Sequence, residues 1–137
     1  MLAQEQPKQI GPVAKKSGVP IKTIRYYEEL GLLKATGRTE GGYRLFDGDI
    51  FTRLSFIKRA QSLGLSLAEI KEFLEVHDQG DLPCDHVRVK LQDKVADIDR
   101  QIQQLQVLKL ELNGLLSGWE DIPEHSESTI CPVIQRV

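Results

Sequence analysis

The sequence predicts a mainly α-helical protein in which short helices and a small β ribbon precede one long helix. In the front half, runs of apolar residues at helical spacing are interrupted by Gly and Pro. Residues 84–116 contain no Pro and only one Gly, which favours a single uninterrupted helix. The chain has 137 residues, 40% apolar and 28% charged, a composition typical of a folded protein.

Charge is distributed unevenly along the chain. Residues 1–62 hold 11 Lys and Arg against 6 Asp and Glu, a net charge of +5, and residues 63–137 hold 7 against 14, a net charge of −7. A basic front half indicates an anionic partner, with a chance asymmetry as the alternative.

The sequence has few features that indicate a membrane span, a signal peptide or a disulfide framework. No stretch approaches 18 consecutive apolar residues, so we expect no membrane span, and the N-terminus lacks the apolar core of a signal peptide. These features predict a cytoplasmic protein with no membrane partner. Two cysteines cannot form a disulfide framework, so we expect free thiols or metal ligands.

The first elements form a helix-turn-helix pattern. Residues 1–9 are polar and we expect them to be frayed. A helix is predicted over residues 11–17 and ends at Gly18, a good stop residue. A second helix is predicted over 21–30 and ends at Gly31. Two short helices joined by a turn that contains Gly are typical of a helix-turn-helix, although other helical hairpins share the pattern.

Residues 33–46 predict a two-stranded ribbon. Gly41 and Gly42 can supply the positive φ angles of a tight hairpin turn, and Arg38 and Arg44 flank that turn. An isolated hairpin is marginal in water, so we expect this ribbon to pack against a helix or a ligand.

Two more helices precede the predicted domain boundary. Apolar residues at helical spacing predict a helix over 47–63. Ser66 and Glu69 fit a capping box at the start of a helix over 67–77. The turn-rich segment 78–83 follows, and we predict that it is a hinge.

The long helix carries a seven-residue repeat, which is typical of a coiled coil. Leu91, Ile98, Leu105 and Leu112 recur every seven residues, Val95 and Ile102 fill the second apolar position, and Lys109 interrupts it. A helix of this length spans about 50 Å. It has too few neighbours in a short chain to cover this stripe, so we predict a homodimer whose helices pair in antiparallel or parallel orientation. The alternative is a helix folded back on its own domain.

This order of elements resembles the MerR family of transcription regulators. The stretches that carry the resemblance are TIRYYEELGLL at residues 23–33, GYRLF at 42–46 and LSFIKRAQSLGLSLAEI at 54–70. The resemblance implies a winged helix-turn-helix DNA-binding domain over 1–77, a dimerisation helix over 84–117 that forms an antiparallel coiled coil, and an effector-binding loop and tail over 118–137.

The resemblance also implies which residues meet DNA. It places Thr23, Arg25 and Tyr26 toward the operator, and Arg38, Tyr43 and Arg44 on the DNA backbone. Lys15 and Lys16 on the first helix would add phosphate contacts, which supply affinity but little sequence choice. One of Tyr26 and Tyr27 is expected to pack in the core instead.

Residues 118–137 follow the long helix, so we do not expect the large drug-binding domain that some family members carry. Cys84 at the helix start and Cys131 beyond the loop resemble the family's divalent-metal sensors, in which a helix-start cysteine joins loop cysteines of the other subunit. Those sensors carry more loop cysteines than this chain, so His125 is predicted as a third ligand; Asp121, Glu124 and His86 are left open. This mixed donor set favours zinc, with mercury, cadmium or lead as alternatives.

The resemblance therefore implies a regulator that distorts promoter DNA when the effector binds, so that RNA polymerase can engage the promoter of metal-resistance or efflux genes. A redox or electrophile sensor that uses the same thiols is the alternative within the family. A coiled-coil adaptor that does not bind DNA is the alternative outside it. The sequence shows no catalytic motif, so we expect no enzyme.

Overall fold

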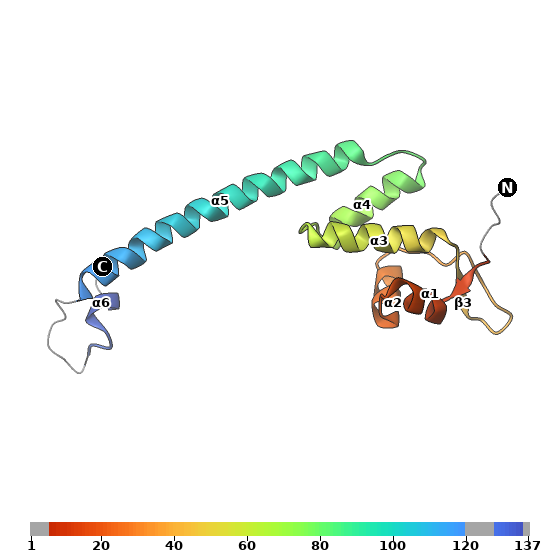
Figure 1. The fold of residues 1–137 in the computed structure, drawn as a ribbon, viewed down its shortest axis with the longest axis horizontal. Coiled ribbons are helices and arrows are strands. Elements are labelled where there is room, and N and C mark those ends of the chain that lie inside the picture. The colour runs from red at the N-terminus through yellow and green to blue at the C-terminus, as the bar shows by residue number, and fades with distance from the viewer. Residues whose placement is uncertain (1–5, 120–127, 136–137) are drawn as a thin grey trace. The chain divides into compact units, whose positions relative to one another are not determined.

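The computed structural model describes residues 6–119 and 128–135. Most of these residues are helical, which confirms the predicted fold class (Figure 1). The elements in chain order are β1 (Lys8–Gln9), α1 (Ile10–Ser17), α2 (Ile21–Glu29), β2 (Gly37–Arg38), β3 (Arg44–Phe46), α3 (Asp49–Ser62), α4 (Leu67–Asp78), α5 (Cys84–Ser117) and α6 (Pro132–Gln135).

Helices α1 and α2 form the predicted helix-turn-helix, and glycine ends both. Gly18 follows α1 with φ 76°, and Gly31 follows α2 with φ 84°. At the end of α2, the Gly31 N–H donates to the Glu28 carbonyl (3.0 Å) and the Leu32 N–H donates to the Tyr27 carbonyl (2.9 Å). This pair of bonds is a Schellman motif, and it makes Leu32 part of the cap of α2.

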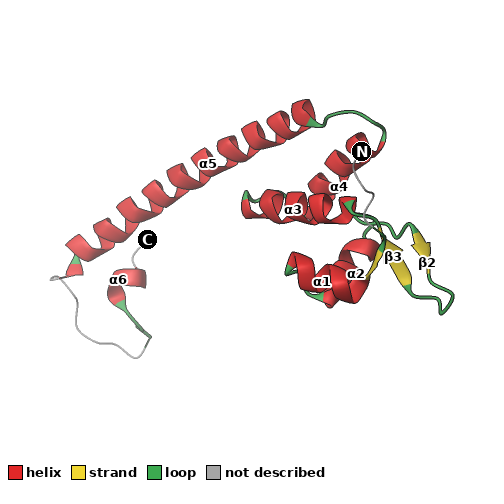
Figure 2. Cartoon of the chain, turned by 45° about the vertical axis from the view of Figure 1, so that its right-hand side comes forward, coloured by secondary structure: helices red, strands yellow, loops and turns green. Residues whose placement is uncertain are grey.

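The ribbon is a three-stranded antiparallel sheet with strand order β1-β3-β2, not the predicted two strands. Lys8 and Gln9, which we expected to be frayed, pair with Phe46 and Leu45 of β3. The hairpin turn also differs, because only Gly42 has a positive φ (85°). Figure 2 shows the β2–β3 hairpin extending beyond the helices, as a wing does.

Helices α3 and α4 pack side by side and complete the core (Figures 1 and 2). The predicted capping box is present: the Ser66 hydroxyl accepts from the Glu69 N–H (3.1 Å), and the Glu69 carboxylate accepts from the Ser66 N–H (2.9 Å). The buried core before the long helix is built by α1, α2, β3, α3, α4 and the segments that join them, through Val13, Ile24, Tyr27, Leu32, Leu33, Phe46, Ile50, Leu54, Ile57, Ala60, Leu65, Ile70, Phe73 and Leu74.

Residue contacts divide the chain into two units, Met1–Leu91 and Gln92–Val137. Val87 and Leu91 on the first turns of α5 pack against the core of the first unit. The second unit contains the rest of α5 and the short helix α6, which was not predicted and whose Val133 is fully buried. The hinge at 78–83 stays a prediction. None of the helices in the described residues combines the length and apolarity needed to cross a membrane.

Candidate functional site

The two adjacent tyrosines of α2 have different environments. Tyr27 is 8% exposed and its hydroxyl donates to Gln61 Oε1 (2.9 Å); burial raises the pKa of this phenol. Tyr26 is 49% exposed. Tyr27 therefore belongs to the core, and Tyr26 is free to contact a partner, as predicted for one of the pair.

Four predicted DNA-contacting residues lie together where α2 meets the wing. Arg25, Arg38, Tyr43 and Arg44 line one open pocket of about 180 Å³, together with Gln9, Ile10 and Gly42. Arg25 comes from α2, and the other three come from the hairpin. The pairing of β1 with β3 completes the pocket because it brings Gln9 and the start of α1 to its edge.

The electrostatics of this pocket suit an anion. Arg44 Nη1 lies 3.0 Å from Glu28 Oε1 on α2, so an ion pair ties the wing to that helix. Arg25 and Arg38 make no ion pair with any residue in 6–119 or 128–135, and both are exposed. Guanidinium groups offer planar pairs of donors that match phosphate oxygens. The pocket can therefore bind a phosphate group of a nucleic acid backbone.

The remaining predicted DNA contacts lie outside this pocket. Lys15 and Lys16 occupy the last turn of α1, where Lys16 Nζ lies 4.7 Å from the centre of the Phe51 ring. Thr23 is half-buried on α2, and Tyr26 is on the exposed side of the same helix. The structure thus places all eight candidates on α1, α2 or the wing, and brings four of them into one surface.

The two cysteines are free thiols that lie in different units. Cys84 is the exposed first residue of α5, and Cys131 is half-buried immediately before α6. Gln135 Oε1 accepts from the N–H groups of Ile130 (2.8 Å) and Cys131 (2.9 Å), which orders the backbone at that thiol. Two thiols that can ionise are suitable donors for a soft divalent cation.

Of the other candidate ligands, His86 is the one that falls within the described residues. His125, Asp121 and Glu124 lie outside the described residues. His86 lines a shallow pocket with Asp85 and Glu72. Within the described ranges, no group of three His, Cys, Asp or Glu side chains is arranged to hold a metal ion. A complete metal site therefore requires ligands beyond those that one described chain brings together.

Arg53 was missed by the sequence analysis. Its side chain is 11% exposed and reaches from α3 to two other segments. Nε and Nη2 donate to the Leu32 carbonyl (3.2 and 2.8 Å), and Nη1 and Nη2 donate to the Asp78 carboxylate (2.6 and 3.3 Å). No local pattern marks this residue, because its partners are 21 and 25 positions away.

The Arg53–Asp78 pair makes stability depend on pH in a defined direction. The Arg53 guanidinium hydrogen-bonds to Asp78 and holds the pKa of that carboxyl below its ordinary value of 3.8. A carboxyl group whose pKa is lowered by folding stabilises the fold at pH values above its unfolded-state pKa. This stabilisation is lost as the pH falls through the folded-state pKa. The Asp78→Asn variant should be less stable by up to about 1 kcal/mol at neutral pH, because the pair is partly exposed.

Urea unfolding followed by circular dichroism between pH 2 and 7 measures this effect. The difference between the unsubstituted chain and Asp78→Asn should be constant near neutral pH and should shrink below about pH 4. A difference that is the same at every pH would contradict this assignment.

Comparisons with known proteins agree with the geometry. The family model described as "MerR HTH family regulatory protein" matches residues 9–76, and the model described as "MerR, DNA binding" matches residues 51–115. The mercuric resistance operon regulatory protein of Bacillus cereus is 40% identical over 128 residues, which cover 93% of this chain and 95% of that relative.

Two solved structures are similar over most of their length. The transcription regulator PbrR691 from Ralstonia metallidurans CH34, in complex with lead(II), matches with a TM-score of 0.73 and 29% identity, covering 93% of this chain and 96% of that one. The dual function transcriptional regulator MerR from Bacillus megaterium MB1, in complex with mercury(II), matches with a TM-score of 0.57 and 37% identity, covering 89% and 92%. The mainly helical fold with a wing and one long helix is therefore shared with solved relatives.

Proposed function

Because the chain belongs to the MerR family of transcription regulators, we propose that it is a metal-responsive regulator that binds promoter DNA as a homodimer. A regulator of this family is not an enzyme, so no catalytic residue is assigned. The observation that carries the proposal is the convergence of Arg25, Arg38, Tyr43 and Arg44 on one surface of α2 and the wing.

In this proposal α2 enters the major groove and the wing follows the adjacent phosphates. An α-helix fits the width of the major groove, and a helix-turn-helix presents its second helix there. Thr23, Arg25 and Tyr26 on α2 approach the operator, and the wing residues contact the backbone. The ion pair with Glu28 supports this role for Arg44, because it holds the wing guanidinium beside α2 before DNA arrives.

The homodimer forms through α5. From Val95 onward its seven-residue repeat is exposed in the single chain: Ile98 is 52%, Ile102 48% and Leu105 64% exposed. Burying such side chains against a second copy removes apolar area from water, which stabilises the pair by about 25 cal/mol for each Å². Two-fold pairing also suits a promoter with two half-sites.

The effector is a soft divalent metal ion. The relatives named above are a regulatory protein of a mercuric resistance operon and two regulators solved with lead(II) or mercury(II), and this chain has thiols at Cys84 and Cys131. We assign Cys84 of one protomer, with the partner subunit's Cys131 and His125, as the ligands of each site. Two thiolates and an imidazole fit zinc best, with mercury, cadmium and lead as alternatives. The bound cation would hold the thiolates together and neutralise their charge.

Metal binding then changes the angle at which the two DNA-binding units hold the promoter. The segment 78–83, which begins at the last residue of α4 and ends just before Cys84, serves as the hinge of this movement. Distorting the promoter costs a few kcal/mol, which a comparable difference in metal affinity between two states supplies. RNA polymerase would engage the distorted promoter and transcribe metal-resistance or efflux genes.

A thiol-based redox or electrophile sensor of the same family is the second candidate. The observation that favours it is Cys84, a free and exposed thiol at the first residue of α5. Metal content of the purified dimer separates the two, since an oxidant sensor needs no stoichiometric metal. A coiled-coil adaptor predicts no affinity for DNA and no salt dependence.

Salt-dependent binding to a promoter fragment tests the DNA interface. Each phosphate contact contributes about 0.9 to the slope of log K against log salt concentration. Because a dimer carries two wings, Arg38→Ala should lower the magnitude of that slope by about two and weaken binding at low salt. Fluorescence anisotropy between 50 and 300 mM salt gives both quantities.

Arg100→Ala provides the matched control, because Arg100 lies on α5 and pairs with Asp97 one turn earlier. Its salt slope should equal that of the unsubstituted chain. If Arg38→Ala and the unsubstituted chain gave equal salt slopes, the wing would be excluded from the DNA interface. Absence of any promoter binding by the unsubstituted chain would contradict the proposed function itself.

A further inference from the structure

Arg53 joins the end of the DNA-reading helix to the start of the linker. Its guanidinium donates two hydrogen bonds to the Leu32 carbonyl and two to the Asp78 carboxylate, at 2.6 to 3.3 Å. Leu32 caps α2, because its N–H closes the last turn at Tyr27. Asp78 is the last residue of α4, immediately before the linker to α5.

From this geometry we propose that Arg53 is the positioning residue that couples the orientation of α2 to the linker before Cys84. The inference rests on the proposed function, because it assigns the route between the metal-binding helix and the DNA-binding helix. One planar side chain spans both partners, so a shift of Asp78 changes the hydrogen bonds that the same guanidinium donates to the Leu32 carbonyl, without an intermediate residue. Lysine cannot replace it, because an ammonium group lacks the rigid fork of five donors.

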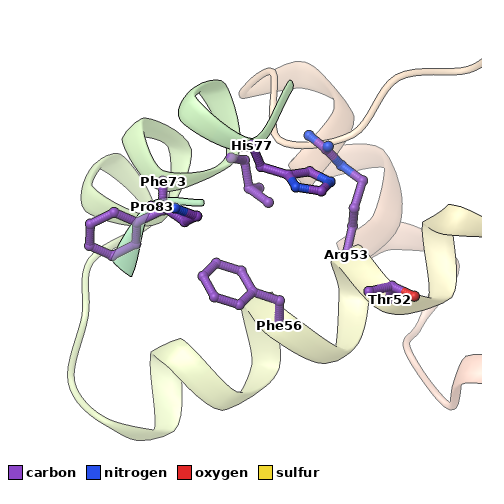
Figure 3. A pocket seen from close by; sticks show the side chains of 7 residues that line it. Thr52, Arg53, Phe56, Phe73, His77 and Pro83 are labelled. Carbon is purple, nitrogen blue, oxygen red and sulfur yellow. The ribbon is translucent and has the colours of Figure 1, made fainter. Parts of the chain in front are cut away.

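The surroundings of the pair allow the linker end to move. A pocket of about 150 Å³ lies between α3 and α4 beside Arg53, lined by Phe56, Phe73, His77 and Pro83 among others (Figure 3). Figure 3 shows the Arg53 side chain rising from α3 toward His77 near the end of α4. Because protein interiors are otherwise close-packed, this space gives the end of α4 and the linker residue Pro83 room to shift.

The two ends of the contact differ in how firmly they are held. Leu32 is fully buried in the core, whereas the Asp78 side chain is 44% exposed. The bonds to Leu32 are therefore the fixed end, and the ion pair to Asp78 is the end that can break and re-form. A residue that couples two segments needs this difference, because one partner must be able to move while the hydrogen bonds to the other, fixed partner change in response.

Two substitutions test the coupling by transcription in vitro. Arg53→Lys keeps the charge but cannot donate to both partners, and Asp78→Asn removes the charged acceptor. The increase in transcript caused by zinc or mercury(II) should fall at least about fivefold in both variants, while promoter affinity and metal affinity change by less than about threefold. Arg59→Lys is the control and should keep full induction, because Arg59 lies on the same helix and its guanidinium donates to the Ser62 hydroxyl. Full induction in both test variants would overturn the inference.

Hydrogen exchange without metal gives a second readout. Coupling is reciprocal, so promoter binding by the unsubstituted chain should slow amide exchange both in α2 and in residues 76–83. In Arg53→Lys, only α2 should be slowed. Equal protection of 76–83 in the two proteins, or none in the unsubstituted chain, overturns the inference. A chain that binds DNA but gives no metal response contradicts the proposed effector, and the exchange result still decides the role of Arg53.

Discussion

Replacing Cys84 with serine should weaken zinc and mercury(II) binding by at least about 100-fold and abolish the response of transcription to metal. A thiolate is the strongest donor in the proposed site, and a serine hydroxyl does not ionise to replace it. Because Cys84 is exposed, the substitution leaves the core of the first unit untouched. Promoter affinity of the metal-free variant should therefore stay within about twofold, since DNA contacts are made elsewhere. Competition titration with a chelator measures the metal affinity.

Mixed dimers show whether each site is shared between protomers. A dimer of one Cys84→Ser chain and one Cys131→Ser chain retains one complete cysteine pair if the ligands come from different protomers. It retains none if both ligands come from the same chain. We therefore expect one high-affinity metal per mixed dimer and none in either variant homodimer, counted by native mass spectrometry. Tight binding by the Cys84→Ser homodimer would reject the proposed ligand set.

The helical part of the fold is predictable because its signals are local. Glycine stops, the Ser66–Glu69 capping box and apolar spacing each act within a few residues, so the helices appear close to the predicted bounds. Strand β1 carries no such signal. Lys8 and Gln9 are a two-residue polar segment, and their pairing depends on β3, which lies more than 30 positions later in the chain. A segment this short has no periodicity to read.

The candidate site was predictable only where the family resemblance supplied residues. The α2 residues, Tyr43 and Arg44 lie in the quoted motifs, and Arg38 flanks the predicted hairpin turn. The structure brings four of these residues together. Arg53 could not be found in this way, because an arginine on a helix usually indicates a solvated charge. Its function depends on Leu32 and Asp78, which only the packing of three helices brings within hydrogen-bond distance. The predicted ligand set at Cys84, His125 and Cys131 stays a prediction.

Replacing Ile98 with aspartate should convert the dimer into a monomer at micromolar concentration and abolish specific promoter binding. Ile98 lies in the middle of the α5 stripe and is 52% exposed in the single chain, so its side chain is available for burial against a second copy. A carboxylate at that position would be buried without a partner in each protomer, at a cost of several kcal/mol. Sedimentation equilibrium between 1 and 50 μM reports the association constant.

The position of the charge on the helix, rather than the charge itself, decides this result. Gln103→Asp introduces the same carboxylate on the face opposite the stripe, so it should leave the dimer intact and serves as the matched control. Loss of the dimer should also remove DNA binding, because a monomer holds one half-site and loses the gain from simultaneous engagement of two. A monomeric Ile98→Asp variant that still binds the full promoter with unchanged affinity would separate dimerisation from DNA recognition. A dimeric Ile98→Asp variant would place the interface of the two copies on a different surface.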